Sequence, residues 1–207
     1  MGIAAIPEIA LALSERESID RIISLGKRPY LMACLERLGC PEEMIENHLC
    51  HYTVSRLHFG NEFCERLIPK IEEWRAVQTK AEQMGMKLTL ALPMMTDYGI
   101  KRVDKLLPHL ESGTEILIND WGILQRLRTS YPSMVPILGR MLNKMVKDPR
   151  LPSEKWTCLH PYRNPQGPFQ ALLKRFNITQ LEMDVPPYAK AEQFDAGALK
   201  LSVHLPY

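Results

Sequence analysis

From residue 52 onward the sequence repeats one pattern, in which a short apolar run is followed by a polar or glycine break and then by a segment with helical periodicity. This alternation is typical of parallel strands connected by helices. The runs that we expect to form strands are Thr53 to Phe59, Leu88 to Leu92, Glu115 to Ile118, Val135 to Leu138, Ile178 to Met183 and Leu201 to Leu205. The pattern therefore predicts an α/β fold.

Helical periodicity accounts for four of the connecting segments. Apolar residues recur every three to four positions in Ile68 to Met84, Ile100 to Leu110, Ile123 to Leu127 and Phe169 to Phe176. Asp97 and Asp120 stand where a side chain can cap the second and third helices, and Pro168 suits the first turn of the fourth. For Thr96, Asp97 and Asp120, capping is about as well supported as contact with a ligand.

The first 51 residues have a different pattern. Ser14 and Glu17 have the spacing of a capping box that leads into a helix. Two more short helices are expected, one ending at Gly39 and one beginning at Pro41. The short run Ile9 to Leu13 is compatible with either a strand or a helix. We therefore expect this segment to be mainly helical.

Composition places the chain among ordinary globular proteins. Lysine and arginine number 26 against 24 aspartate and glutamate, 45% of the residues are hydrophobic and 24% are charged. A nucleic-acid-binding domain usually carries a basic stripe, and a disordered chain has few core residues and a high net charge, so both classes are disfavoured. Ile9 to Leu13 is far shorter than the roughly 20 residues that span a membrane, and Pro7 and Glu8 stand where a signal peptide has its basic flank. We therefore expect a cytoplasmic protein without a membrane or DNA partner.

Polar side chains follow most of the expected strands. We predict that five of them bind substrate, namely Asn61, Asn119, Arg140, Asn143 and His204. Because the carboxyl ends of parallel strands converge, we expect Asn61, Cys64, Asn119, Arg140 and His204 to lie on one face. Arg140 follows an apolar run beside a glycine, and a fixed guanidinium suits a carboxylate or a phosphate.

The chain has five cysteines, an odd number at scattered positions, so we expect reduced thiols or metal ligands rather than a disulfide framework. Cys34, Cys40 and Cys158 have no neighbour at metal-site spacing and are predicted to be structural. Cys64 stands just past an expected strand end, where it is either a small apolar residue at a helix start or part of a site. The histidines and cysteines around Cys50 lack the paired spacing of a zinc site.

In their order along the chain, six short motifs resemble the collagenase-like peptidases. They are LHFGNEFCERL (Leu57 to Leu67), LTLALP (Leu88 to Pro93), EILINDWGIL (Glu115 to Leu124), VPILGRMLNK (Val135 to Lys144), ITQLEMD (Ile178 to Asp184) and LSVHLPY (Leu201 to Tyr207). The ordered set is more specific than any single motif. The family also contains proteins that hydroxylate tRNA and the paired iron–sulfur proteins of oxygen-independent ubiquinone hydroxylation, to which the motifs are most similar.

The resemblance implies a TIM-like (β/α) barrel. A complete barrel usually has eight strands in about 250 residues, and this chain has 207 residues with six or seven candidate strands. We therefore expect an incomplete barrel that forms one domain, with a helical segment over residues 1–51 and βα repeats over residues 52–207. Because the family's barrel continues beyond the strand that resembles LSVHLPY, the chain is expected to be truncated at its C-terminus.

The resemblance also implies a ligand for a 4Fe-4S cluster. In members that carry the cluster, a strand-glycine-x-x-x-cysteine segment supplies one thiolate, which corresponds to Cys64 in this chain. The other three cysteines follow the strand that resembles LSVHLPY. This chain is therefore not expected to hold a complete cluster by itself, unless Cys50, Cys158 or a partner protein of the same family substitutes. The implied substrate is a small molecule or one linked to RNA.

The sequence leaves open whether the protein is an enzyme. It contains no Ser/His/Asp or Cys/His pair at a known local spacing and no H-E-x-x-H motif, so proteolysis has no mechanism that can be written for it. The leading hypothesis is a barrel protein related to the iron–sulfur hydroxylation accessory proteins. The alternatives are a non-catalytic binding or scaffold barrel without a cluster, and a peptidase proper.

Overall fold

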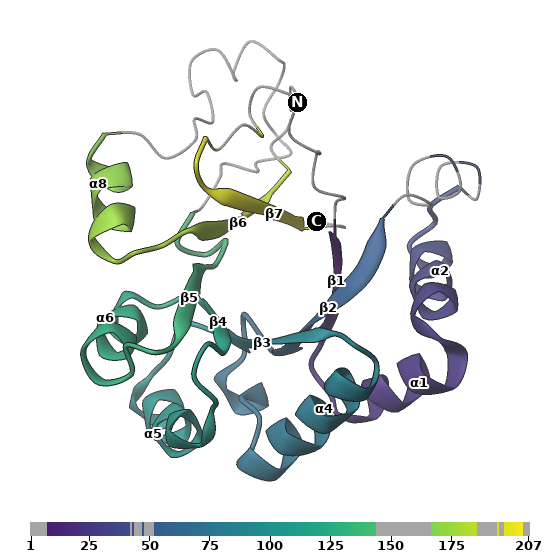
Figure 1. The fold of residues 1–207 in the computed structure, drawn as a ribbon, viewed down its shortest axis with the longest axis horizontal. Helices are drawn as coiled ribbons and strands as arrows, with labels where there is room; N and C mark the ends of the chain where they lie inside the picture. The colour runs from purple at the N-terminus through teal and green to yellow at the C-terminus, as the bar shows by residue number, and fades with distance from the viewer. Residues whose placement is uncertain are drawn as a thin grey trace. The chain divides into compact units, whose positions relative to one another are not determined.

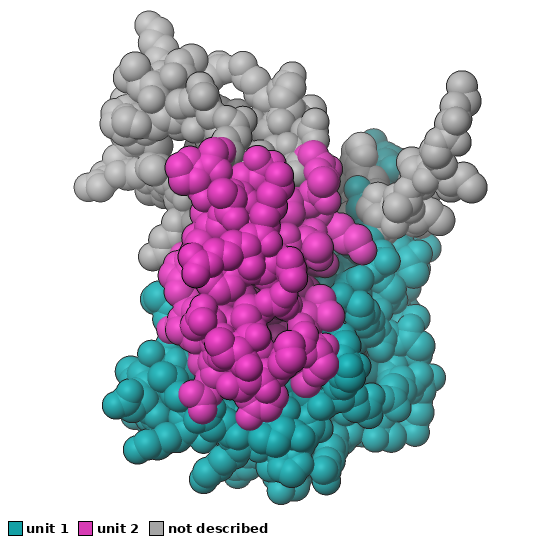
Figure 2. All heavy atoms as spheres, turned by 60° about the vertical axis from the view of Figure 1, so that its left-hand side comes forward, with its two compact units in different colours: residues 1–115 teal, residues 116–207 magenta. Residues whose placement is uncertain are grey.

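The chain forms a mixed α/β structure. The structure is a computed structural model, and it describes residues 8–41, 43, 47, 52–143, 167–185, 194 and 197–204. It divides into two compact units, residues 1–115 and residues 116–207, which Figure 2 colours separately. The strand pairs described below are all parallel. The α/β class with parallel strands is therefore confirmed, and the single-domain organisation stays a prediction.

Unit 1 is built on three parallel strands, β1 (Glu8–Leu13), β2 (Thr53–Gly60) and β3 (Lys87–Leu92), in that order (Figure 1). Leu11 lies opposite Leu57 in the first pair, and Phe59 lies opposite Leu90 in the second. The last four residues of both β2 and β3 are buried without alternation. Such continuous burial is typical of parallel strands that are covered on both faces.

The α-helices described in unit 1 are α1 (Glu17–Leu25), α2 (Lys27–Arg37), α4 (Ile71–Gln83) and α5 (Asp97–Leu106), with short 3-10 helices η1 (Glu65–Leu67) and η2 (Leu107–His109). Three of these four α-helices, namely α1, α4 and α5, bury side chains, whereas α2 has no fully buried residue. In α4 the buried residues are Trp74, Val77 and Ala81, which recur at the three-to-four spacing that predicted the helix. Burial of these side chains stabilises the packing of α4 on the strands by roughly 25 cal/mol per Å² of apolar area removed from water.

Unit 2 contains most of β4 (Glu115–Ile118), followed by α6 (Trp121–Ser130), β5 (Val135–Leu138), α8 (Pro168–Arg175), β6 (Gln180–Asp184) and β7 (Lys200–His204). Strand β5 pairs with β6 at Leu138 and Leu181, and β6 pairs with β7 over its whole length. The core of this unit consists mainly of branched aliphatic side chains, and Ile118, Leu138 and Leu181 have no exposed surface.

All six expected strands are present, with shifts of one or two residues at their ends. The largest shift is in β6, which begins at Gln180 rather than at Ile178. A seventh strand, β1, shows that the run from Ile9 to Leu13 is extended. A mainly helical N-terminal segment is therefore not confirmed as a whole, because its first part is a strand that pairs with β2. The helix expected from Pro41 falls largely outside the described residues.

Two expected helix caps are wrong. The predicted capping box fails because α1 begins at Glu17 without a side-chain cap, while the Ser14 hydroxyl accepts a hydrogen bond from Asn61 Nδ2 at 3.0 Å. Helix α5 is capped by Thr96 rather than Asp97, since the Thr96 hydroxyl accepts from the backbone N–H of Tyr98. The third cap is confirmed, because Asp120 accepts from the first turn of α6.

Among the described residues, no helix has the length and apolar character that would let it cross a membrane.

Candidate functional site

The loop after β2 in unit 1 is fixed by Asn61. Its Oδ1 atom accepts hydrogen bonds from the backbone N–H groups of Phe63 and Cys64, both at 2.8 Å. Its Nδ2 atom donates to Ser14, which follows β1. Gly60 permits this turn, because its φ is 119° and a Cβ there would lie 2.3 Å from the carbonyl oxygen of Ala91 in β3. Asn61 therefore shapes the loop that presents Cys64.

Glu65, which sequence reasoning missed, ties the same loop to α5. Its carboxylate accepts from the backbone N–H of Thr96 at 2.9 Å and from the Thr96 hydroxyl at 2.8 Å. These hydrogen bonds lower the pKa of the Glu65 carboxyl below its ordinary value, and the bond from the Thr96 backbone contributes more than the bond from its hydroxyl. The sequence offered one indication of this role, since Glu65 directly follows Cys64, the candidate site residue.

Cys64 is half-buried and has a free thiol, as do Cys34 and Cys40. Four thiolates are needed to hold a 4Fe-4S cluster. Within the described ranges, no close group of three metal-ligating side chains includes a cysteine, while Cys50 and Cys158 lie outside those ranges. The described cysteines therefore do not form a cluster site, and Cys64 supplies at most one ligand.

Asn119 links the carboxyl ends of β4 and β5 in unit 2. Its side chain has no exposed surface, and its Oδ1 atom accepts from the backbone N–H of Met141 at 3.0 Å. It also fills the space beside Gly139, where a Cβ would lie 2.2 Å from Asn119 Oδ1. Its observed role is therefore to hold the backbone before and after Arg140.

Arg140 lies directly after β5 and forms an ion pair with Asp184, the last residue of β6. The Nη1 atom of Arg140 is 2.8 Å from Asp184 Oδ1, and the two side chains are 17% and 20% exposed. An arginine that is partly shielded from water and held by a carboxylate has a defined orientation. The prediction that Arg140 lies at a strand end is confirmed, and Asp184 is its observed partner.

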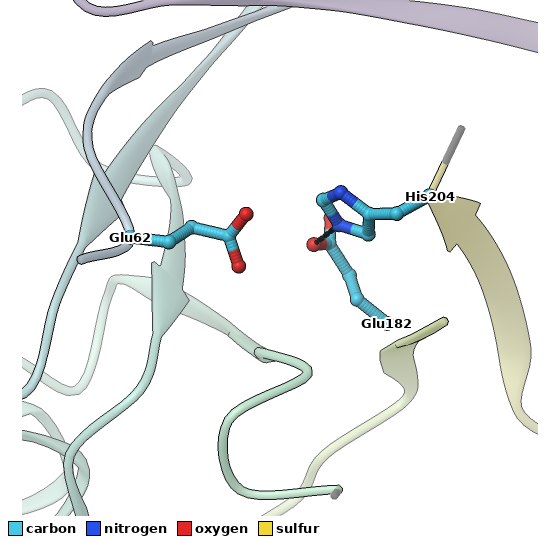
Figure 3. Close-up of side chains that lie close together, drawn as sticks. All are labelled: Glu62, Glu182 and His204. Carbon is cyan, nitrogen blue, oxygen red and sulfur yellow. Dashed lines mark hydrogen bonds and ion pairs between the residues drawn. The ribbon is translucent and has the colours of Figure 1, made fainter. Parts of the chain in front are cut away.

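Glu182 and His204 form a part-buried polar contact between β6 and β7 (Figure 3). The figure shows the imidazole of His204, at the end of β7, facing the carboxylate of Glu182 in β6. The third labelled residue, Glu62, belongs to unit 1. Glu182 is fully buried and the His204 side chain is 19% exposed. Since Asp184 pairs with His204 in the strand register, Glu182, Asp184 and His204 share one face of the two strands.

Sequence reasoning missed Glu182, although a single acid inside the apolar run ITQLEM was a usable signal. Burial of a carboxylate is costly unless it is paired, and a histidine held by a carboxylate is a common arrangement for accepting or donating a proton. Asn143 lies next to this pair, because its Nδ2 atom donates to the backbone oxygen of Glu182 at 3.3 Å. The geometry therefore combines a fixed cation with an acid–base pair in unit 2.

A second polar cluster lies at the amino-terminal ends of the strands in unit 1. The buried carboxylate of Glu115 contacts Arg56 at 2.5 Å, Thr89 at 3.1 Å and the ammonium group of Lys87. Burial by itself raises the pKa of Glu115, but the hydrogen bond from Lys87 and the charge of Arg56 outweigh it, so the pKa lies below its ordinary value. Such a cluster, away from the carboxyl ends, fits a role in stability.

The predicted site residues thus fall into two sets. Asn61 and Cys64 lie just after β2 in unit 1, whereas Asn119, Arg140, Asn143 and His204 lie at strand carboxyl ends in unit 2. The second set is connected through Asp184 and Glu182. A single face shared by both sets stays a prediction.

The fold and this site define an α/β protein with parallel strands and polar side chains at their carboxyl ends. No protein family, curated protein or solved structure matches the chain.

Proposed function

We propose that the protein is an incomplete (β/α) barrel of the collagenase-like peptidase type that binds a small anionic substrate at the strand carboxyl ends of unit 2. The observation that carries this proposal is the Arg140 guanidinium, fixed by Asp184 next to the part-buried contact between Glu182 and His204. The family relation rests on the ordered motifs of the sequence. The anion-binding role rests on the geometry of unit 2.

The chemistry of these side chains indicates the kind of substrate. A guanidinium presents its donors in a plane that matches a carboxylate or a phosphate. The surrounding side chains of Asn143, Asp184 and His204 are polar, so a hydrophilic molecule fits better than an apolar one. In this proposal His204, which contacts Glu182, exchanges a proton with the substrate that Arg140 holds.

Replacement of Arg140 by glutamine is expected to weaken binding of a small anion by roughly tenfold to a hundredfold, because a hydrogen-bonded charge contributes about 1.5–3 kcal/mol. Isothermal titration calorimetry with malate, glycerol phosphate and a short single-stranded RNA would measure this and separate the two substrate classes. The matched control is Lys174→Gln, which removes an exposed cation from the last turn of α8.

Equal affinities for the wild-type protein and Arg140→Gln, or an equal loss in Lys174→Gln, would contradict the proposal. Failure of every anion to bind would also contradict it. Binding of RNA alone, with loss in Arg140→Gln, would identify an RNA-linked substrate. Release of peptides from gelatin would instead support the peptidase alternative.

A second candidate role concerns Cys64 as one ligand of a 4Fe-4S cluster. The observation that favours it is the position of the half-buried thiol, in a loop held by Asn61 at the carboxyl end of β2. The remaining thiolates would have to come from outside the described residues or from a partner of the same family. This role is independent of anion binding in unit 2.

Anaerobic reconstitution with iron, sulfide and excess glutathione is expected to give less than one cluster per chain, and Cys64→Ser is expected to remove the iron that is bound. Iron and sulfide assays measure both results. The control, Cys34→Ser, changes a thiol within α2 and should leave iron binding unchanged. A full cluster that survives Cys64→Ser, or no bound iron in the wild-type protein, would count against this role.

A further inference from the structure

A pocket of about 340 Å³ opens in unit 1 between the first half of α2 and the amino end of β2. Its lining comes from residues 27–32 and residues 52–54, two segments that Figure 1 shows close to each other in space. Small-molecule sites usually begin at about 300 Å³. The pocket is thus large enough for a compact ligand. Its lining contains no cysteine and none of the candidate site residues of unit 2.

The charged part of the lining consists of Lys27 and Arg28. The ammonium group of Lys27 donates to the carbonyl oxygen of Met84 at 3.3 Å, so its observed partner is neutral. Arg28 is exposed. Within the part of the chain that the structure describes, no acidic side chain lines the pocket and no ion pair involves either cation. Among the described residues, the two positive charges that line the pocket therefore have no carboxylate partner.

The rest of the lining is mainly apolar. Leu31 and Met32 are half-buried, one turn along α2 from the cations, and Val54 is 7% exposed. Tyr52 adds an aromatic ring that is 39% exposed. An apolar floor next to two cations is complementary to a molecule with one anionic end and one apolar end.

We propose that this pocket binds a small organic anion with an apolar body, a carboxylate or phosphate head carried on a short alkyl or aryl chain. The head group contacts Lys27 and Arg28, and the apolar body covers Leu31, Met32 and Val54. This site is distinct from the loop of Asn61 and Cys64, because the two lie at opposite ends of β2, about 25 Å apart at 3.3 Å per residue.

Isothermal titration calorimetry with octanoate, octyl phosphate and octan-1-ol tests the proposal on the full 207-residue chain. Both anions are expected to bind more tightly than the neutral alcohol. Arg28→Gln and Lys27→Gln are each expected to weaken anion binding by roughly threefold to tenfold, with little change for octanol. The charge control is Lys105→Gln, an exposed lysine in the last turn of α5.

Comparison of the two anions tells whether the head group is a carboxylate or a phosphate. Octanol binding as tightly as octanoate, no binding of either anion, or unchanged affinity in Arg28→Gln would each overturn the proposal. Arg28 is exposed, so this variant is expected to keep the fold of the wild-type protein. A loss of octanoate binding in Arg140→Gln, with no loss in Arg28→Gln, would place the ligand in unit 2 and also overturn it.

Discussion

Replacement of Gly60 by alanine is expected to lower the free energy of unfolding by about 3–5 kcal/mol, because it combines a strained backbone with a steric clash. Gly60 has a φ of 119°, and an added Cβ would lie 2.3 Å from the carbonyl oxygen of Ala91. That oxygen belongs to β3, the strand that pairs with β2, so the clash separates two strands of the core. Urea denaturation followed by circular dichroism measures the change.

The matched control is Gly113→Ala. Gly113 also has a positive φ, 85°, but a Cβ there has no heavy atom within 4 Å. This variant is expected to lose only about 1–2 kcal/mol, the conformational part of the effect. Similar losses in the two variants would show that the close approach of β2 and β3 is unimportant. Faster thiol labelling of Cys64 in Gly60→Ala would show that the loop held by Asn61 has also moved.

Replacement of Glu115 by glutamine is expected to cost about 2–3 kcal/mol of stability at neutral pH. Loss of one partner from a buried ion pair typically costs about 3–5 kcal/mol. The cost is lower here because the Lys87 side chain is 51% exposed and Arg56 keeps its contact with Glu8. The control is Glu8→Gln, which removes a 49% exposed carboxylate from the same arginine and is expected to cost less than about 1 kcal/mol. Equal costs in the two variants would contradict the argument.

The contribution of Glu115 is expected to disappear on acidification. Its pKa in the folded protein lies below its ordinary value. The carboxylate therefore stabilises the protein fully above the unfolded-state pKa of about 4.3, and this contribution is lost as the pH falls through the folded-state pKa. The difference in urea midpoint between wild type and Glu115→Gln should accordingly shrink below that pH. A difference that stays constant down to strongly acidic pH would be inconsistent with this assignment.

The sequence by itself determined the α/β class and the positions of six strands. Strands could be predicted because a buried parallel strand is a short continuous apolar run. Helices could be predicted because their apolar residues recur every three to four positions, as Trp74, Val77 and Ala81 do in α4. Both signals are local. It also placed Arg140 and His204 at the ends of strands, since each follows or closes such a run.

Only the tertiary structure decided which residues at these ends meet. Ser14 has the local spacing of a helix cap, yet its hydroxyl accepts a hydrogen bond from Asn61, which follows the next strand. Glu182 looks like part of an apolar run until β7 brings the His204 imidazole into contact with its carboxylate. The extended form of β1 was likewise settled by pairing with β2. Hydrogen bonds and ion pairs between strands join residues tens of positions apart, and their formation depends on sheet register, which local periodicity does not encode.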